Sequence, residues 1–139
     1  MPKDTNGTKS PPRAALRPTL KEAMSYITAT EIDLLTFFEV EPAMNDTNVP
    51  WVYNDSTYSI TRPDSSILFG IHPASKDVRI TITNQGETVY ELQAASIVNV
   101  TYHSEHNGES LHLQLNDHDE LWLSVKPHIT LRQACDNRA

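Results

Sequence analysis

The chain has 139 residues, of which 38% are hydrophobic and 21% charged, and this suits one soluble globular domain rather than a disordered protein. Its four glycines lie far apart, which excludes a Walker loop and a dinucleotide-binding fingerprint, because both need clustered glycines against a phosphate. The single Cys135 excludes a disulfide framework and a multi-cysteine zinc site.

Charge is spread unevenly along the chain. Residues 1–23 hold five basic and two acidic residues, whereas the remainder holds six basic and sixteen acidic residues, a net charge of -10. Phosphate binding needs a basic surface, so the sequence excludes a nucleic-acid partner. An acidic body attracts a basic protein or a cation, and it also simply maintains solubility.

The first 23 residues are rich in Pro, Lys, Arg, Thr and Ser and contain no apolar run. They are predicted to form a disordered basic tail, followed by one globular β-rich domain over residues 24–139. The chain shows no secretory signal and no apolar stretch of membrane-spanning length, so a cytoplasmic protein without membrane contact is expected.

The first regular element is predicted to be a helix over about residues 30–40. Thr30 followed by Asp33, or Thr28 followed by Glu31, resembles a helix N-cap with an acidic residue three positions on. Apolar side chains then recur at helical spacing: Ile32, Leu34, Leu35, Phe37 and Phe38. Such an apolar helix must cover another element.

Residues 42–56 are predicted to form an irregular connection that contains several Pro and Asn residues. Trp51 and Tyr53 lie in this connection. They either fold back as a plug on the core or rim a binding site, because long loops in compact domains often carry function.

Beyond residue 56 the hydrophobic period changes to two, which predicts strands. Four-residue turns are predicted at 62–65 and 73–76, and a three-residue loop at 84–86. The connection over 94–96 contains no turn residue. Gly70, inside one strand, indicates a bulge or a close backbone approach.

Asn107-Gly108 is the strongest hairpin signal, because a type I′ turn needs positive φ at both central positions. Placing these two residues in the turn sets His103 directly opposite His112 on the polar face. Glu105 then becomes a diagonal neighbour of His112.

The next hairpin is predicted to close through a three-residue loop at 117–119. This pairing sets Leu113 opposite Leu123 on the apolar face and Gln114 opposite Trp122 on the polar face. A slip by one residue would expose the leucines, so the pattern favours this arrangement.

These elements predict an α+β fold in which the N-terminal helix packs on a roughly six-stranded antiparallel meander sheet. A sheet with one apolar face needs a cover, and the helix supplies it. The alternative is a partly closed β-barrel with a helix, because short strands can curl around the same core.

The predicted function is a non-catalytic binding module without a cofactor, an inhibitor-like partner of a basic protein. Its binding surface is expected to be the polar sheet face and the 42–56 loop, represented by Trp122, Gln114, His112, His103, Trp51 and Tyr53. Trp122 is the expected anchor, since its neighbours Leu121 and Leu123 take inward positions. The C-terminal segment or a second copy of the chain could cover it instead.

Two alternative functions remain open at this point. His103, His112 and Glu105 could hold a divalent metal and make the protein a small metal-assisted hydrolase. An open sheet face offers no pocket that excludes water, which argues against this enzyme. The chain could also be a structural subunit that associates with itself through an edge strand or Trp122.

Overall fold

The computed structural model describes residues 26–135, so the predicted tail over 1–23 lies outside the described residues. The described part contains one helix, α2 (Glu31–Phe38), a 3₁₀ turn (Trp51–Tyr53) and nine strands. The strands are β1 (Ala43–Met44), β2 (Ser56–Thr61), β3 (Ser65–His72), β4 (Asp77–Asn84), β5 (Glu87–Ala94), β6 (Asn99–Glu105), β7 (Gly108–Gln114), β8 (Asp119–Ser124) and β9 (Thr130–Cys135).

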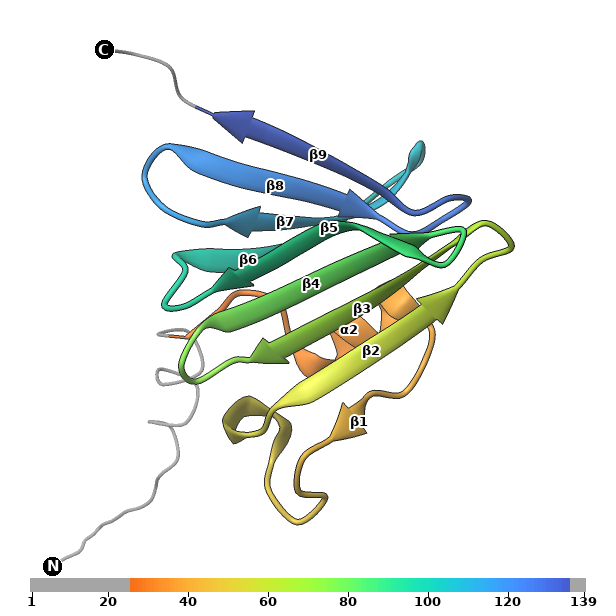
Figure 1. Ribbon diagram of the computed structural model, residues 1–139. Coiled ribbons are helices and arrows are strands. Elements are labelled where there is room, and N and C mark those ends of the chain that lie inside the picture. The colour runs from red at the N-terminus through yellow and green to blue at the C-terminus, as the bar shows by residue number, and fades with distance from the viewer. Residues whose placement is uncertain (1–25, 136–139) are drawn as a thin grey trace, which may run out of the picture.

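The strands form two separate sheets, and within each sheet every strand pairs antiparallel with the next one along the chain (Figure 1). One sheet has the order β1-β2-β3-β4-β5 and the other β6-β7-β8-β9. The predicted α+β class, a helix packed with an antiparallel meander, is confirmed. The strands are more numerous than the expected six or so, and within residues 26–135 they form two sheets and no closed barrel.

The break between the sheets falls at the connection that lacks a turn residue. After β5 the backbone of Ser96 takes a positive φ of 54°, and its N–H donates to Asp77 Oδ1 at 3.1 Å. The next N–H, of Ile97, donates to the Lys76 carbonyl at 2.9 Å. These bonds hold the connection against the start of β4, so the chain leaves the first sheet instead of forming another hairpin.

Alternation along the strands produces one continuous core between the two sheets. The first sheet contributes a set of fully buried side chains, among them Tyr58, Phe69 and Ile80, and the second contributes Leu113 and Leu123. The inward face of each strand is therefore the one that the period-two pattern predicts.

The helix begins at the predicted N-cap Thr30, whose Oγ1 accepts from the Asp33 N–H at 3.1 Å. Asp33 returns the bond by accepting from the Thr30 N–H at 3.0 Å, which completes a capping box. The helix ends at Phe38 because Glu39 turns to the left-handed conformation with a φ of 60°. The helix therefore ends four residues before Pro42, a residue that could not continue it.

The helix covers both sheets at once. Phe38 stacks on Tyr58 of β2 with a centroid separation of 4.8 Å, while Phe37 lies edge-on to Tyr102 of β6 at 6.2 Å. Leu34 completes the buried helix face. Ile32, which the apolar spacing placed among the covering residues, is 72% exposed because it lies on the opposite side of this short helix.

Two of the predicted turns have the predicted pairing: Thr61 lies opposite Ser66, and His72 lies opposite Asp77. The β4–β5 hairpin differs from the prediction. Its turn consists of Gln85 and Gly86, both with positive φ, and a bulge next to Ile82 adds one residue to β5.

The β6–β7 register is displaced by two residues from the predicted one. Glu105 pairs with Gly108, so the turn is His106-Asn107 and not Asn107-Gly108. Gly108 opens β7 with a φ of 133°, a conformation that side chains disfavour. The predicted opposition of His103 and His112 is therefore wrong: His112 lies opposite Thr101.

The β7–β8 register shows the same kind of displacement. Leu113 lies opposite Leu121 and His112 lies opposite Trp122, and residues 115–118 separate the two strands. A slip of two residues leaves every side chain on its predicted face. For this reason the hydrophobic pattern predicts the faces correctly and does not distinguish the two registers.

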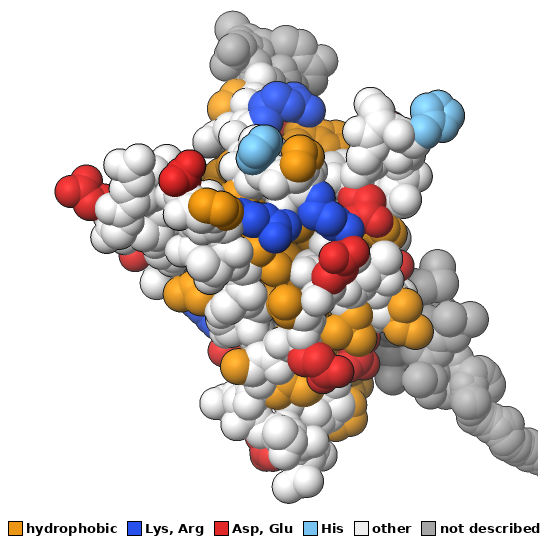
Figure 2. Space-filling view, turned by 90° about the vertical axis from the view of Figure 1, so that its right-hand side faces the viewer, with side chains coloured by type: hydrophobic (Ala, Val, Ile, Leu, Met, Phe, Trp, Pro, Cys, Tyr) orange, Lys and Arg blue, Asp and Glu red, His pale blue; other side chains and the backbone are white. Residues whose placement is uncertain are grey.

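Cationic side chains connect the two sheets and the helix at one end of the molecule. Arg62, after β2, donates from Nε to the Val125 carbonyl at the end of β8 at 3.1 Å. Lys126 Nζ lies 2.7 Å from Glu39 Oε2 and 3.0 Å from Glu109 Oε1. The view in Figure 2 shows Lys and Arg side chains beside acidic ones near the middle of this end. In the described part of the chain, no helix is long and apolar enough to cross a membrane.

Candidate functional site

The outer face of the β6–β9 sheet carries a row of four side chains, one from each strand. Thr101 lies opposite His112, His112 opposite Trp122, and Trp122 opposite Arg132. Trp122 points outward because its neighbours on β8 are the fully buried Leu121 and Leu123. The alternation of side chains along β8 thus places Trp122 on the outer, polar face of the sheet, where the sequence pattern predicts it.

Flat side chains surround the Trp122 indole. The His112 ring lies 4.2 Å from the indole centroid at an interplanar angle of 31°, and the His103 ring lies at 5.2 Å and 43°. The guanidinium carbon of Arg132 lies 5.7 Å from the ring centroid, a cation–π contact. We call these four residues, His103, His112, Trp122 and Arg132, the Trp122 cluster.

Glu120 of β8 fixes the orientation of His112. Its Oε1 lies 2.5 Å from His112 Nε2, and the two side chains retain exposed fractions of 35% and 17%. A carboxylate at this distance fixes the imidazole ring beside the indole.

Gln114 borders the same face at the loop that joins β7 and β8. It lies opposite Glu120, and its Nε2 donates to the Asn116 carbonyl at 2.6 Å. The Asn116 side chain accepts from the N–H groups of His118 and Asp119 and donates to the Asp119 carboxylate. The loop is therefore shaped by its own hydrogen bonds.

Cys135, at the end of β9, pairs with Asp119 across the sheet. A hydrogen bond to Asp119 is the main cause that raises the pKa of the Cys135 thiol. Hydrogen bonds from Asn116 and then from Cys135 lower the pKa of the Asp119 carboxyl. Since the thiolate is the reactive form, this contact suppresses nucleophilic chemistry at Cys135.

The predicted metal ligands do not come together. The His103 and His112 rings are neighbours, with centroids 6.1 Å apart, but Glu105 lies four residues beyond Thr101, the residue opposite His112. Among residues 26–135, no three His, Cys, Asp or Glu side chains gather in an arrangement that could hold a metal ion. The two-residue displacement of the hairpin is the reason.

Trp51 and Tyr53 lie on the 3₁₀ turn at the other side of the molecule. Trp51 is only 8% exposed, and its Nε1–H donates to Tyr58 Oη at 3.0 Å within the core. Tyr53 is 49% exposed and packs edge-on against Tyr26 at 6.2 Å. Trp51 therefore anchors this turn, and Tyr53 is the member of the pair that faces solvent.

The sequence prediction missed β9, which supplies Arg132 to the Trp122 cluster. The signal is the alternation of Ile129 and Leu131, both partly buried, with the exposed polar residues Thr130 and Arg132. A strand that follows His128 extends the sheet by one member and places a cation on the tryptophan. Arg132 of β9 thus contacts Trp122, whose side chain remains partly exposed.

No protein-family model matches the chain, and no curated protein matches it in sequence. Among solved structures, the chain is similar to one chain of the contact-dependent growth inhibition toxin–immunity protein complex from Klebsiella pneumoniae 342. The similarity has a TM-score of 0.67 and 14% sequence identity, and it covers 79% of this chain and 96% of that chain. At this identity the likeness shows a shared fold.

Proposed function

We propose that the chain is a non-catalytic protein-interaction module that binds a basic protein in the manner of an inhibitor. The contact surface is the outer face of β6–β9, with the Trp122 cluster at its centre and Gln114 at its border. The observation that carries this proposal is an outward tryptophan packed against the tilted His112 and His103 rings and against Arg132. Tryptophan and arginine are the residue types that most often anchor protein interfaces.

The preorganised geometry supports a binding role. The His112–Glu120 contact and the packed rings restrict the rotamers of the cluster before any partner arrives. A partner that docks on Trp122 therefore orders few additional side chains, which lowers the entropic cost of association.

Charge supports a basic partner. Residues 26–135 contain fifteen Asp and Glu but five Lys and Arg, an excess of ten negative charges. Two of the five cations, Arg79 and Lys126, already pair with Asp55, Glu39 and Glu109. The excess steers a positively charged protein toward the module and raises its association rate.

The structural neighbour supports a protein partner as well. That chain belongs to a complex of a toxin and an immunity protein, in which each protein has the other as its partner. An immunity-like inhibitor that neutralises a basic toxin is the specific form of this proposal. We place the interaction in the cytoplasm, where a lone thiol such as that of Cys135 stays reduced.

The test compares three versions of the purified protein: the wild type, Trp122→Ala and Leu68→Ala. Leu68 is the matched control because it is a 49% exposed apolar residue on the outer face of the other sheet. Each version captures proteins from an extract of the host, and the captured protein is purified and titrated back by calorimetry. We expect a basic protein whose binding weakens at least about tenfold in Trp122→Ala, as for a typical hot spot, and not in Leu68→Ala.

Two results would contradict the proposal. Equal affinity of the Trp122→Ala variant for the purified partner would remove the β6–β9 face from the interface. A stable homodimer in light scattering that dissociates on Trp122→Ala would show that a second copy occupies this face, which is the structural-subunit alternative.

A further inference from the structure

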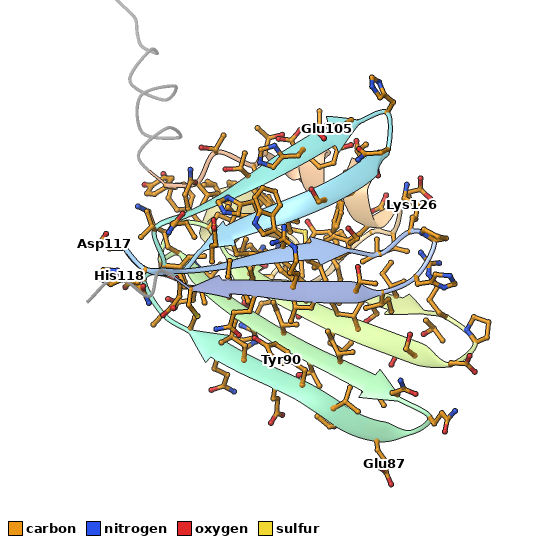
Figure 3. All side chains as sticks on the ribbon, turned by 90° about the horizontal axis from the view of Figure 1, so that it is seen from above. Glu87, Tyr90, Glu105, Asp117, His118 and Lys126 are labelled. Carbon is orange, nitrogen blue, oxygen red and sulfur yellow. The ribbon has the colours of Figure 1, made fainter. Side chains whose placement is uncertain are left out.

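Strands β5 and β9 end their sheets, and a hollow of about 380 Å³ lies between them. Figure 3 shows the labelled Tyr90 between β9 and the β4–β5 hairpin. The hollow is lined by residues of β3, β4 and β5 on one side and by the β9 segment on the other: Ser65, Ile82, Asn84, Val89, Tyr90, Ile129, Leu131 and Gln133.

Five of the eight side chains that line this hollow are hydrophobic, and the other three are polar. Ile82 forms part of the core, and Tyr90, Ile129 and Leu131 pack against it as partly buried side chains. Burial raises the pKa of the Tyr90 hydroxyl, so this wall is already partly shielded from water. Val89 forms the rim and is 60% exposed, because the bulge next to Ile82 turns β5 at this point.

Unpaired backbone groups border the hollow on both sides. Within the described part of the chain, β5 pairs with β4 alone and β9 pairs with β8 alone. Each strand therefore presents a row of free N–H and C=O groups, which is a template for the addition of another strand.

Acidic residues near one end of the hollow favour a positively charged occupant. The Asp64 carbonyl accepts from the Gln85 N–H at 2.9 Å, which holds Asp64 beside the β4–β5 turn. Glu87, opposite the lining residue Asn84, begins β5 at the same end. Asp64 and Glu87 are thus backbone neighbours of the lining residues Ser65 and Asn84, and together with the acidic excess of residues 26–135 they favour an occupant that carries Lys or Arg.

We propose that the hollow between β5 and β9 is a docking site for an extended segment of a protein partner. The segment adds as a strand along the β5 edge, places an apolar side chain against Tyr90 and Leu131, and sets a Lys or Arg beside Asp64 and Glu87. The proposal rests on the proposed function in requiring a protein partner, but it uses a surface distinct from the Trp122 cluster.

The test uses a displayed library of random peptides of about nine residues, the length of an ordinary strand. The library is selected against the wild-type protein, and the enriched peptides are synthesised and titrated against Val89→Lys and Leu68→Lys. Both substitutions replace an exposed apolar residue of the same sheet by lysine, so neither disturbs the core.

We expect enriched peptides that alternate apolar and polar residues and carry Lys or Arg. Their affinity should fall at least about tenfold in Val89→Lys, since a lost apolar contact and a new repulsion act together, and stay unchanged in Leu68→Lys. Bound peptide should slow the hydrogen exchange of the β5 edge amides, which a side-chain contact alone would not do.

Three results would overturn the proposal: no enrichment of alternating basic peptides, binding that Val89→Lys leaves intact, or binding without slower exchange in β5. A homodimer that dissociates on Val89→Lys would also overturn it, because a second copy would then fill the hollow. If peptide binding persists in Trp122→Ala, the site between β5 and β9 does not depend on the Trp122 cluster. Failure of the proposed function is judged separately, from the Trp122→Ala experiment with the captured partner.

Discussion

The guanidinium of Arg79 occupies the space that a side chain on Gly70 would fill. A β-carbon built on Gly70 would lie 2.2 Å from Arg79 Nη2 and 2.6 Å from its Cζ. The glycine allows the arginine of β4 to cross β3 on the outer face and bind Asp55, with Nη1–Oδ1 and Nη2–Oδ2 separations of 3.0 and 3.1 Å. The close approach at Gly70 is therefore made by a side chain.

This relationship predicts that Gly70→Ala depends on Arg79. In an Arg79→Ala background, alanine should stabilise the strand by about 0.5–1 kcal/mol, the usual gain over glycine. In the wild type, the displaced guanidinium loses its pairing with Asp55, worth about 0.2–1 kcal/mol for partly exposed groups, so the gain should disappear. Urea denaturation of the four proteins measures the coupling, and an identical effect of Gly70→Ala in both backgrounds would contradict it.

Ser56 supplies a second prediction, about a buried hydroxyl. Ser56 is fully buried at the start of β2, and its Oγ has no hydrogen-bond partner among the described residues. Ser56→Ala should raise the free energy of unfolding by about 1 kcal/mol, because an unsatisfied polar group is removed without leaving a cavity. Ser124→Ala is the matched control: its Oγ donates to the Glu109 carbonyl at 3.2 Å, so this change should destabilise the protein. Thermal or urea unfolding that gives both changes the same sign would refute the assignment.

The carboxyl group of Glu109 predicts a loss of stability in acid. Burial by itself raises the pKa of Glu109, but hydrogen bonds from Lys126 and Tyr102 and the charge of Lys126 outweigh it and lower this pKa. A lowered native pKa means that the unfolded chain takes up a proton first as the pH falls. The stabilisation is therefore complete above the ordinary glutamate pKa of about 4.3 and is lost progressively as the pH falls through the lower native value.

Glu109→Gln removes the charge but keeps the shape of the side chain. We expect it to destabilise the protein by roughly 1 kcal/mol at pH 7, since the pair with Lys126 is partly exposed. The difference from the wild type should shrink below about pH 4. Unfolding measured between neutral and acidic pH checks this, and a difference that persists in acid would exclude a charge effect.

The buried hydroxyl of Tyr58 predicts a loss of stability at alkaline pH. Burial is the main cause that raises the pKa of Tyr58 to about 12, and the hydrogen bond from Trp51 only partly opposes it. The unfolded chain then loses the tyrosine proton first as the pH rises, so stability should fall from about pH 10, the ordinary value, to about pH 12. Tyr58→Phe should lack this contribution, although it leaves the Trp51 indole N–H without its acceptor and destabilises the protein at neutral pH. Alkaline unfolding curves of the two proteins should diverge at pH 7 and converge in base.

Some features of this protein follow from the sequence alone. The capping pair Thr30 and Asp33, the turns over 62–65 and 73–76, and the outward position of Trp122 between inward leucines all depend on residues close together in the chain. Local hydrogen bonds and a period of two determine them, and neither changes when the strands find different partners.

The tertiary structure alone decided which strands meet and in which register. A slip of two residues preserves the faces of β6, β7 and β8, so the alternation that identified the core could not place Thr101, rather than His103, opposite His112. The two sheets are joined by the packing of Phe37 and Phe38 between them, and the hollow beside Tyr90 forms where residues of β5 meet residues of the β9 segment. Those contacts join residues far apart in the chain, and their free energy is realised only when the whole core assembles.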